Sequence, residues 1–327
     1  MRLVLSLLLA FTAMAGVARA AEVTIRFPVE YAIDIAPGVA NQEFKKLVEE
    51  RTSGRVEVKL FPSGSLYKGL DLVQAILRGD AEMTTLTSAY WTALSKKLFV
   101  FELPYAFPDR AAFYRAADDA AFIDGIYDEV AAKGAKAIAI LPYDHFAFAT
   151  RKTPLLNPRD MAGLKMRGLG RVNSTILSTL GASPVSLNLV ELSPALQQGV
   201  VDGLNAPIDL MLNYKWHESV RHVMVGPVYQ AFYPWMVNAK WWNGLAPALR
   251  KTIQDTATEV AQRHRARAEA ETQKGIEGMR AQGVEVHIQT DAEKKAWAEA
   301  TQPVWTQFEA EIGKEPIAKV KSFAAAK

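Results

Sequence analysis

The sequence NPRDMAGLKMRGLG (residues 157–170) places a single arginine, Arg167, between a short apolar run and a pair of glycines. Residues 165–167 have the character of a strand, and the glycines favour a sharp turn into a following helix. An arginine at the end of such a strand can pair with a neighbouring acid such as Asp160 or Glu191, or it can bind an anionic ligand. The surrounding sequence has to decide between these two interpretations.

Segments with strand character alternate with segments with helix character on both sides of this stretch. Alternating apolar residues predict strands at residues 23–27, 56–60, 82–86, 137–141 and 184–187. Helical spacing of apolar residues predicts helices from residue 37 to near residue 54 and at residues 70–77, 173–180 and 193–198. This alternation predicts an α/β fold in which helices cover the faces of parallel sheets.

The C-terminal third contains one long helical pattern, which runs from Pro247 towards Gln282. At about 1.5 Å per residue this helix would reach roughly 45 Å or more, so we expect it to lie along two lobes rather than one. Residues 284–288 then alternate as a strand, and Asp291 begins a last amphipathic helix. The residues predicted to face inward from that helix are Trp297, Val304, Phe308 and Ile312.

Residues 1–20 have the pattern of a secretory signal peptide. Arg2 is followed by an apolar run over residues 3–17 and by the small residues Ala18 and Ala20. The run is shorter than the roughly 20 residues that a bilayer span needs. An uncleaved anchor helix is the alternative, but the small residues favour cleavage near Ala20 and export of the mature protein.

Composition limits what the mature protein can be. The chain has 327 residues and no cysteine, so its stability depends on a hydrophobic core, and its length favours two lobes over one domain. Of the 38 Lys and Arg residues, Arg2 and Arg19 lie in the signal segment, which leaves 36 against 35 acidic residues. A charge so close to zero excludes the basic composition of a typical nucleic-acid-binding protein.

The sequence lacks the motifs that an exported α/β hydrolase or lyase would use. It contains no G-x-S-x-G motif and no cysteine nucleophile. His217 and His222 resemble the zinc motif H-E-x-x-H, but a spacing of five residues would turn them about 140° apart on a helix. Gly168 and Gly170 begin a G-x-G-x-x-G pattern whose third glycine is replaced by Asn173. Ligand recognition is therefore favoured over catalysis, and no cofactor is expected.

Several blocks of this sequence resemble, in the same order, the solute-binding proteins of tripartite ATP-independent periplasmic (TRAP) transporters. The resemblance covers essentially the whole mature chain, and the arginine of the family motif ED-LKGLK-R matches Arg167. The blocks are FKKLVEERTSGRVEVKLFPSGSLYKGLDLVQAILRGDAEM (residues 44–83), FELPYAFPD (101–109), PRDMAGLKMR (158–167), LGASPVSLNLVELSPALQQGVVDG (180–203) and NAKWWNGLAPALRKTI (238–253).

The resemblance implies a two-lobed α/β fold of the type II periplasmic-binding-protein kind, with the long helix spanning both lobes. It implies a first lobe of residues 21–143 and 233–272 and a second lobe of residues 144–232 and 273–327. In the family the matching arginine binds the carboxylate of a small organic acid in the cleft between the lobes. The loaded protein then delivers this ligand from the periplasm to a small and a large membrane subunit. A monomer is expected, because no segment reads as an obligate interface.

Two positions depart from the family pattern. Many members have a second arginine where this chain has Phe146, and many read DGQENP where this chain reads DGLNAP (residues 202–207). The family asparagine aligns with Ala206, and Asn205 lies one place earlier. A second carboxylate would lose charge-assisted bonds worth roughly 1.5–3 kcal/mol each. We therefore expect a ligand with one carboxylate and an apolar or aromatic body, with C4-dicarboxylate binding as the alternative.

The predicted ligand site combines Arg167 with residues from both lobes. Aromatic residues that could line it are Phe146, Tyr90, Trp91, Tyr233 and Trp235, although each could belong to the core instead. Candidates to close over the ligand are Tyr31, Glu82, Thr87 and Ser88. Asn205, Ala206 and Asp209 complete the predicted site.

Two further alternatives share this fold. A periplasmic sensor could bind the same acid and report to a receptor instead of a transporter, and the sequence does not separate these roles. Ligand binding through a bound metal ion is disfavoured by the DGLNAP segment.

Overall fold

The computed structural model describes residues 21–187 and 189–326 of the chain. The predicted signal peptide, residues 1–20, lies outside the described residues. None of the helices in the described part has the combination of length and hydrophobicity that a membrane span requires.

The first lobe is built on a sheet that has both parallel and antiparallel pairs. β1 (Val23–Pro28) and β2 (Val56–Phe61) are parallel, and β3 (Met83–Thr85), β10 (Gln230–Asn238) and β4 (Ala135–His145) form an antiparallel group in the order β3-β10-β4. A bridge between Val29 and Thr85 places β1 beside β3. The alternation of Ile25 and Phe27 with more exposed neighbours buries one face of β1, as the sequence pattern predicts.

Helices cover both faces of this sheet. α1 (Ala36–Arg51) has Pro37 in its first turn, and α2 (Leu70–Arg78) is followed by Gly79 in the left-handed conformation that glycine favours. α3 (Arg110–Asp118) and α4 (Ala120–Ala132) are capped by the side chains of Asp109 and Asp119. The 3-10 helices η1 (Ser88–Trp91) and η2 (Lys96–Glu102) connect β3 to these helices.

The second lobe is built on a six-stranded sheet with the order β11-β9-β5-β8-β6-β7. β6 (Lys165–Gly168) is parallel to β7 (Ser183–Ser186) and β8 (Gly203–Ala206), whereas β5 (Ala147–Thr150) is antiparallel to β8 and β9 (His222–Val225). β11 (Glu285–Ile288) adds to the edge beside β9. Helical elements of this lobe are α5 (Gly170–Thr179), α6 (Leu192–Gln198), α7 (Ile208–Asn213), η3 (Pro158–Met161), η4 (Leu189–Glu191) and η5 (Trp216–Glu218).

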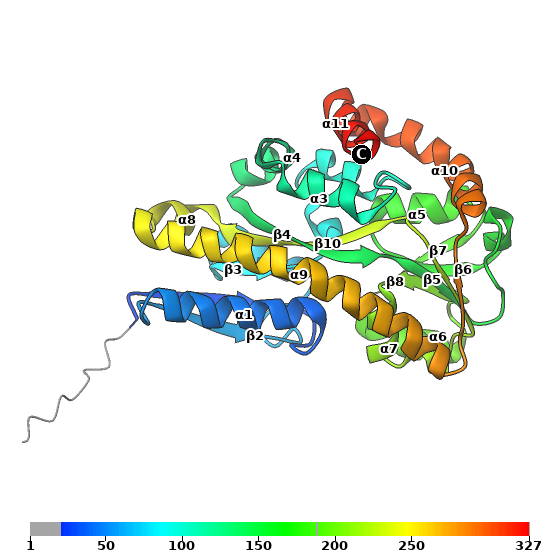
Figure 1. The fold of residues 1–327 in the computed structure, drawn as a ribbon, viewed down its shortest axis with the longest axis horizontal. Coiled ribbons are helices and arrows are strands. Elements are labelled where there is room, and N and C mark those ends of the chain that lie inside the picture. Colours follow the sequence, from blue (N-terminus) through cyan, green and yellow to red (C-terminus); the bar gives the residue numbers. More distant parts are fainter. Residues whose placement is uncertain (1–20, 188, 327) are drawn as a thin grey trace, which may run out of the picture.

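One helix and two strands connect the lobes. α8 (Ala239–Gly244) leads into α9 (Pro247–Ala281), whose 35 residues correspond to roughly 50 Å. α9 packs against α1 and β4 at one end and against α7 at the other, and Figure 1 shows it running diagonally across the molecule. β4 and β10 pair side by side and lead the chain into and out of the second lobe. The predicted α/β fold with a long helix spanning two lobes is confirmed.

The C-terminal helices tie the two lobes together. α10 (Asp291–Ile312) packs on α5 of the second lobe and on η2 of the first, and α11 (Lys314–Ala325) packs on α3 and α4 of the first lobe. The indole Nε1 of Trp305 donates to the carbonyl oxygen of Pro104 at 2.9 Å. The division into lobes at residues 144, 233 and 273 stays a prediction. It assigns α11 to the second lobe, whereas α11 packs against helices of the first lobe.

Three details of the sequence-based prediction are corrected. The sheets are mixed rather than purely parallel, because β10 returns antiparallel to β4 over a long register that periodicity does not reveal. The helix with buried Trp297, Val304, Phe308 and Ile312 is not the last, since Gly313 ends it and α11 follows. His217 and His222 lie in η5 and β9, so they do not share a helix.

Candidate functional site

Arg167 is a buried cation at the carboxyl end of strand β6. Arg167 is only 4% exposed, and its Nε donates to the carbonyl oxygen of Leu187 at 3.3 Å. Among the described residues it makes no other hydrogen bond and no ion pair within 4.0 Å, so neither Asp160 nor Glu191 is its partner. Asp160 instead accepts from the backbone N–H groups of Leu156 and Asn157. A buried guanidinium without a counter-ion is suited to binding an anion.

Loss of water around Arg167 lowers its pKa from the ordinary arginine value. Four titratable groups oppose this effect through their electrostatic interaction with the guanidinium: Tyr90, Tyr233, Glu30 and Tyr229. Glu30, Tyr90 and Tyr233 belong to the first lobe, where Tyr233 lies on β10, and Tyr229 directly precedes β10. The structure thus surrounds one arginine with tyrosine hydroxyls and a carboxyl group.

Tyrosine rings pack against one another beside Arg167. Tyr233 forms an edge-to-face pair with Tyr31 and a tilted pair with Tyr143, with centroid separations of 5.4 Å in both cases. The hydroxyl of Tyr31 accepts a 3.1 Å hydrogen bond from Asn41 of α1, which fixes the ring. Such rings offer flat apolar faces and hydroxyl groups to the same ligand.

Glu30 lies two residues after the end of β1 and is a site residue that the sequence analysis did not single out. Its carboxylate accepts from the backbone N–H of Gly69 at 3.1 Å, and it interacts with the hydroxyl of Tyr90. Burial raises the pKa of Glu30, while the Gly69 bond and the charge of Arg167 lower it. Burial and the neighbouring Glu30 charge raise the pKa of Tyr90 to about 12. The strand-end position after an alternating strand could have indicated Glu30.

Asp209 contributes a second buried carboxyl group at the start of α7. The hydroxyl of Tyr143 donates to its Oδ2 at 2.7 Å, and burial raises the pKa of Asp209 to about 6. Phe146, which precedes β5, packs edge-to-face on Tyr229 at 4.8 Å, and its backbone N–H donates to the Tyr229 carbonyl oxygen at 2.9 Å. Asp209 and Phe146 are therefore linked to the tyrosine group around Arg167.

The strand register separates two neighbouring residues, Ala206 and Asn205. Met166 of β6 pairs with Gly203 of β8, so the pleat places Arg167 and Ala206 on one face of the sheet and Asn205 on the other. Ala206 is buried on the face of the arginine. The residue that replaces the family asparagine thus lies on the same side as Arg167.

Asn205 instead faces the side of the sheet that α5 and α10 cover. It pairs in register with Phe148, whose ring packs on Trp297 of α10 at 6.3 Å. Asn205 is 0% exposed, and its side-chain amide has no hydrogen-bond partner among the described residues. The structure does not bring Asn205 together with Arg167.

Three other predicted residues also lie away from Arg167. Trp235 is buried between Phe27 and Phe44, and its Nε1 donates to Asn41 at 3.0 Å. Trp91 belongs to the fully buried core. Glu82 precedes β3 and pairs with Arg26 at 2.6 Å, at the strand end opposite to the end that leads to Tyr90.

Thr87 and Ser88 follow β3 and lie in the loop that leads to Tyr90. The Oγ1 atom of Thr87 is buried without a partner among the described residues. Ser88 is buried beside Glu102, which the sequence did not indicate as a site residue. Among the described residues, neither Thr87 nor Ser88 forms a hydrogen bond with Arg167.

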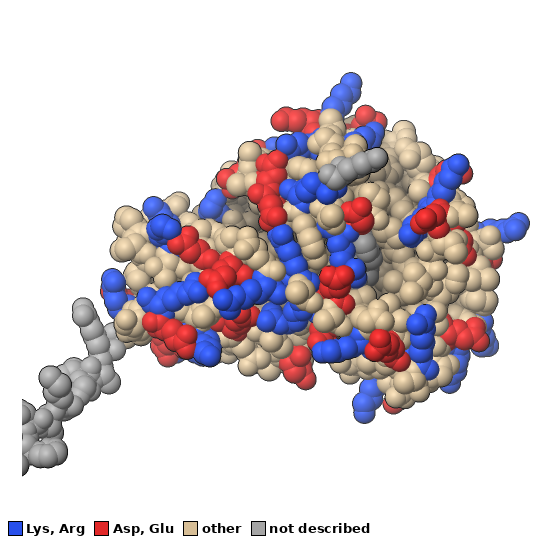
Figure 2. Space-filling model, viewed as in Figure 1, with Lys and Arg blue, Asp and Glu red and all other residues tan. Residues whose placement is uncertain are grey.

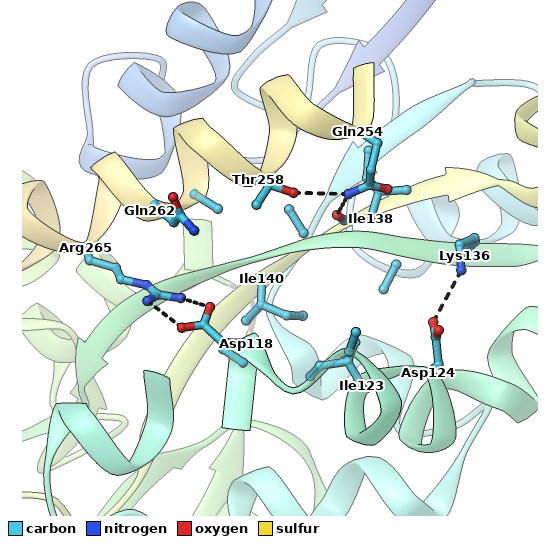
Figure 3. Close-up of a pocket in the computed structure, with 15 residues that line it drawn as sticks. Asp118, Ile123, Asp124, Lys136, Ile138, Ile140, Gln254, Thr258, Gln262 and Arg265 are labelled. Atoms are coloured by element: carbon cyan, nitrogen blue, oxygen red, sulfur yellow. Dashed lines mark hydrogen bonds and ion pairs between the residues drawn. The ribbon is translucent and has the colours of Figure 1, made fainter. Parts of the chain in front are cut away.

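A separate hollow of about 420 Å³ lies on the outer edge of β4, between α4 and α9 (Figure 3). Its apolar floor includes Ile138 and Ile140, and ion pairs join Asp118 to Arg265 and Asp124 to Lys136 across it. Arg167 does not line this hollow. The hollow is therefore distinct from the predicted ligand site.

The surface charges and the arrangement of the acidic residues favour neither a nucleic-acid-binding face nor a metal site among the described residues. Figure 2 shows basic and acidic side chains interspersed on the face that α9 crosses, where Arg263 and Arg267 both pair with Glu43. Such a pattern differs from the basic face of nucleic-acid-binding proteins. Within the described residues, no group of three His, Asp or Glu side chains is arranged to hold a metal ion.

Comparison with known proteins identifies the family. Residues 36–311 match the sequence profile of DctP, described as the bacterial extracellular solute-binding protein, family 7. The chain is 32% identical to the C4-dicarboxylate-binding periplasmic protein DctP of Rhodobacter capsulatus over 312 residues, which cover 94% of this chain and 93% of that protein.

This chain belongs to family 7 of the bacterial extracellular solute-binding proteins.

Solved structures of TRAP periplasmic solute-binding proteins have the same fold as this solute-binding protein. The protein from Sulfurospirillum deleyianum, with bound succinate, has a TM-score of 0.85 and 28% identity, covering 93% of this chain and 99% of that one. The protein from Desulfovibrio salexigens, with bound orotic acid, has a TM-score of 0.85 and 25% identity, covering 92% and 97%. The resemblance to TRAP solute-binding proteins is confirmed, and the family consists of transport proteins rather than enzymes.

Proposed function

We propose that this solute-binding protein is the periplasmic component of a TRAP transporter and binds an organic acid that carries one carboxylate. The ligand carboxylate pairs with Arg167, and the body of the ligand packs against Tyr31, Tyr90 and Tyr233. The observation that carries this proposal is the burial of Arg167 without an anionic partner among the described residues.

Arg167 supplies most of the binding free energy in this proposal. A guanidinium can form two parallel bonds to one carboxylate, and exclusion of water strengthens the ion pair. Closure of the two lobes around the ligand provides this exclusion, since Arg167 belongs to the second lobe and Tyr31 and Tyr90 to the first. The ligand thus supplies the ion-pair partner within 4.0 Å that Arg167 lacks among the described residues.

The electrostatics of the site favour a single carboxylate. Glu30 and Asp209 flank the tyrosine group, and among the described residues Arg167 is the only Lys or Arg that interacts with both Glu30 and Tyr90. A second carboxylate would meet carboxyl groups and the apolar residues Ala206 and Phe146 rather than a second cation. Like charges at such separations are costly in a buried site. A neutral ring or a hydroxyl-bearing body fits these surroundings.

Binding of a C4-dicarboxylate is the second candidate function. It is favoured by the name of the Rhodobacter capsulatus relative, which is 32% identical to this chain. In that case the Tyr233 hydroxyl would donate a hydrogen bond to the second carboxylate in place of a cation. The two candidates differ in ligand class but share Arg167.

The proposed role includes delivery to the small and large membrane subunits of the transporter by a monomeric protein, after removal of the signal peptide near Ala20. A role as a sensor would use the same ligand site and a receptor instead of the membrane subunits. Transport of the bound acid in a strain that carries both subunits, and its loss when the gene for this chain is deleted, separates these two roles.

The test of the ligand class is a thermal-shift panel of matched acids: butyrate, benzoate, 4-hydroxybenzoate, orotate, succinate and L-malate. A ligand at 100 times its Kd stabilises the protein by about 2.7 kcal/mol, which gives a clear rise in Tm. We expect a ring-bearing monocarboxylate to give the largest shift and Arg167→Met to abolish it. A larger shift with succinate or malate supports the second candidate and overturns the first. No shift with any acid overturns both.

A further inference from the structure

Glu102 is a buried carboxyl group to which the proposed contacts with the ligand assign no role. It ends η2 and is 0% exposed. Neither of its carboxyl oxygens has a hydrogen-bond partner with acceptable distance and angle among the described residues. A carboxylate in this position would be both desolvated and poorly compensated, which is rare in folded proteins.

The side chains that face Glu102 are hydroxyl groups rather than cations. The hydroxyls of Tyr229, which precedes β10, and Ser88, of η1, favour its charged form. Tyr127 of α4 also faces it, with a hydroxyl that has no partner among the described residues. From the second lobe Gly170 approaches, because a Cβ built there would lie 3.9 Å from Oε2 of Glu102 and 3.4 Å from Ala89. Glu102 therefore lies where the two lobes meet.

Tyr229 connects this carboxyl group to the ligand site. Burial raises the pKa of Tyr229, the charge of Glu102 raises it further, and the charge of Arg167 lowers it. The same hydroxyl thus interacts with both Glu102 and Arg167. Its single proton can be donated either to Glu102 or to an anion bound at Arg167, but not to both at once.

We propose that Glu102 is a positioning residue that takes up one proton when the acid ligand binds, so that its carboxyl group donates to Tyr229 and Tyr229 donates to the ligand carboxylate on Arg167. An ionised Glu102 would accept the Tyr229 proton, and the tyrosine oxygen would then turn a lone pair towards the ligand anion. The proton comes from solvent, and no bond other than hydrogen bonds forms or breaks. This inference rests on the proposed function.

Burial raises the pKa of Glu102 to about 8, and the hydroxyls of Tyr229 and Ser88 only partly oppose this effect. If the lobes open at the contact with Gly170, water would reach the carboxyl group and its pKa would fall towards the ordinary value of about 4.3. The closed, ligand-bound state consequently holds more protons than the open state between these pH values. Affinity is therefore highest at low pH and falls as the pH rises towards 8, by at most about tenfold per pH unit.

The proton is counted by isothermal titration calorimetry with orotate and with succinate as probes. Each titration is run at pH 7.5 in phosphate and in Tris, because these buffers differ in ionisation enthalpy. We expect an uptake of about 0.8 proton per bound acid from a closed-state pKa near 8, and none in Glu102→Gln, whose amide can still donate to Tyr229. In Glu102→Gln the affinity should also lose its dependence on pH between 6 and 8.

Asp209→Asn and Glu30→Gln are the matched controls, because both groups are carboxyls near the site whose pKa values burial also raises. Both variants should keep the proton uptake at pH 7.5. Uptake that survives Glu102→Gln, or wild-type binding with the same heat in both buffers, overturns the inference and leaves the proposed function intact. If Glu102→Gln does not fold, the proton uptake of wild type and the variant Tyr229→Phe decide the question. Tyr229→Phe should keep the proton uptake but bind the acid more weakly at every pH. Absence of binding by either acid overturns the proposed function and the inference together.

Discussion

The hydroxyl of Tyr143 donates a 2.7 Å hydrogen bond to the buried carboxyl group of Asp209. This bond joins β4, which leads into the second lobe, to the first turn of α7. Burial raises the pKa of Asp209 from its ordinary value to about 6 despite this bond. The pair therefore couples the connection between the lobes to the protonation of one side chain.

Asp209→Asn should change the pH dependence of stability. A carboxyl group whose pKa is higher in the folded than in the unfolded protein stabilises the fold as the pH falls through that folded pKa. Wild type should therefore gain stability between pH 7 and pH 4, whereas Asp209→Asn should not. Relative to wild type, the variant should be most stable at pH 7 and should lose about 1–3 kcal/mol of unfolding free energy by pH 4. Urea denaturation of both proteins at pH 4, 5, 6 and 7 measures this difference. A constant difference across the four pH values would contradict the assignment.

Arg167→Met should separate ligand binding from stability. Loss of two charge-assisted bonds of roughly 1.5–3 kcal/mol each should weaken acid binding by about two to four orders of magnitude. The ligand-free protein should be as stable as wild type or more stable by about 1–2 kcal/mol, because a buried unpaired cation is removed. Calorimetric titration and urea denaturation measure the two effects. A clear loss of stability in the ligand-free variant would mean that Arg167 has a structural role.

Glu30→Gln should relax the selectivity for a single carboxylate. Removal of a negative charge beside Arg167 should strengthen succinate binding by about 1–2 kcal/mol, or roughly 5- to 30-fold, with a smaller effect on benzoate. Competition binding with both acids measures the ratio. Glu82→Gln is the matched control, since Glu82 precedes β3, pairs with Arg26 and should leave the ratio unchanged. Equal ratios in wild type and both variants would exclude Glu30 as a selectivity determinant.

Tyr233→Phe and Trp235→Phe should have opposite effects although the two residues lie on the same face of β10. Trp235→Phe removes the hydrogen bond to Asn41 and leaves a void among Phe27 and Phe44, so it should cost about 2–4 kcal/mol of stability and leave the Kd unchanged. Tyr233→Phe should weaken ligand binding about tenfold with a loss of stability below about 1 kcal/mol. Thermal unfolding and titration calorimetry of each variant separate the core residue from the site residue.

The sequence by itself determined the α/β class, most element boundaries and the position of Arg167. These features depend on local periodicity, on breakers such as Gly79 and Pro37, and on a motif that lies within a short stretch of chain. The long helix was predictable because its residues 247–281 contain no proline after the first position and few breakers. Local chemistry is sufficient for all of these.

Only the tertiary structure decided which side chains surround Arg167. A shift of one residue along a strand turns a side chain to the other face, so Ala206 lies on the side of the arginine and Asn205 does not. Glu30 and Glu102 have no unusual sequence context, and their pKa values are raised because distant segments remove water from them. Burial and the convergence of segments are properties of the folded chain, so they set the electrostatics of the site in a way that residue order alone does not specify.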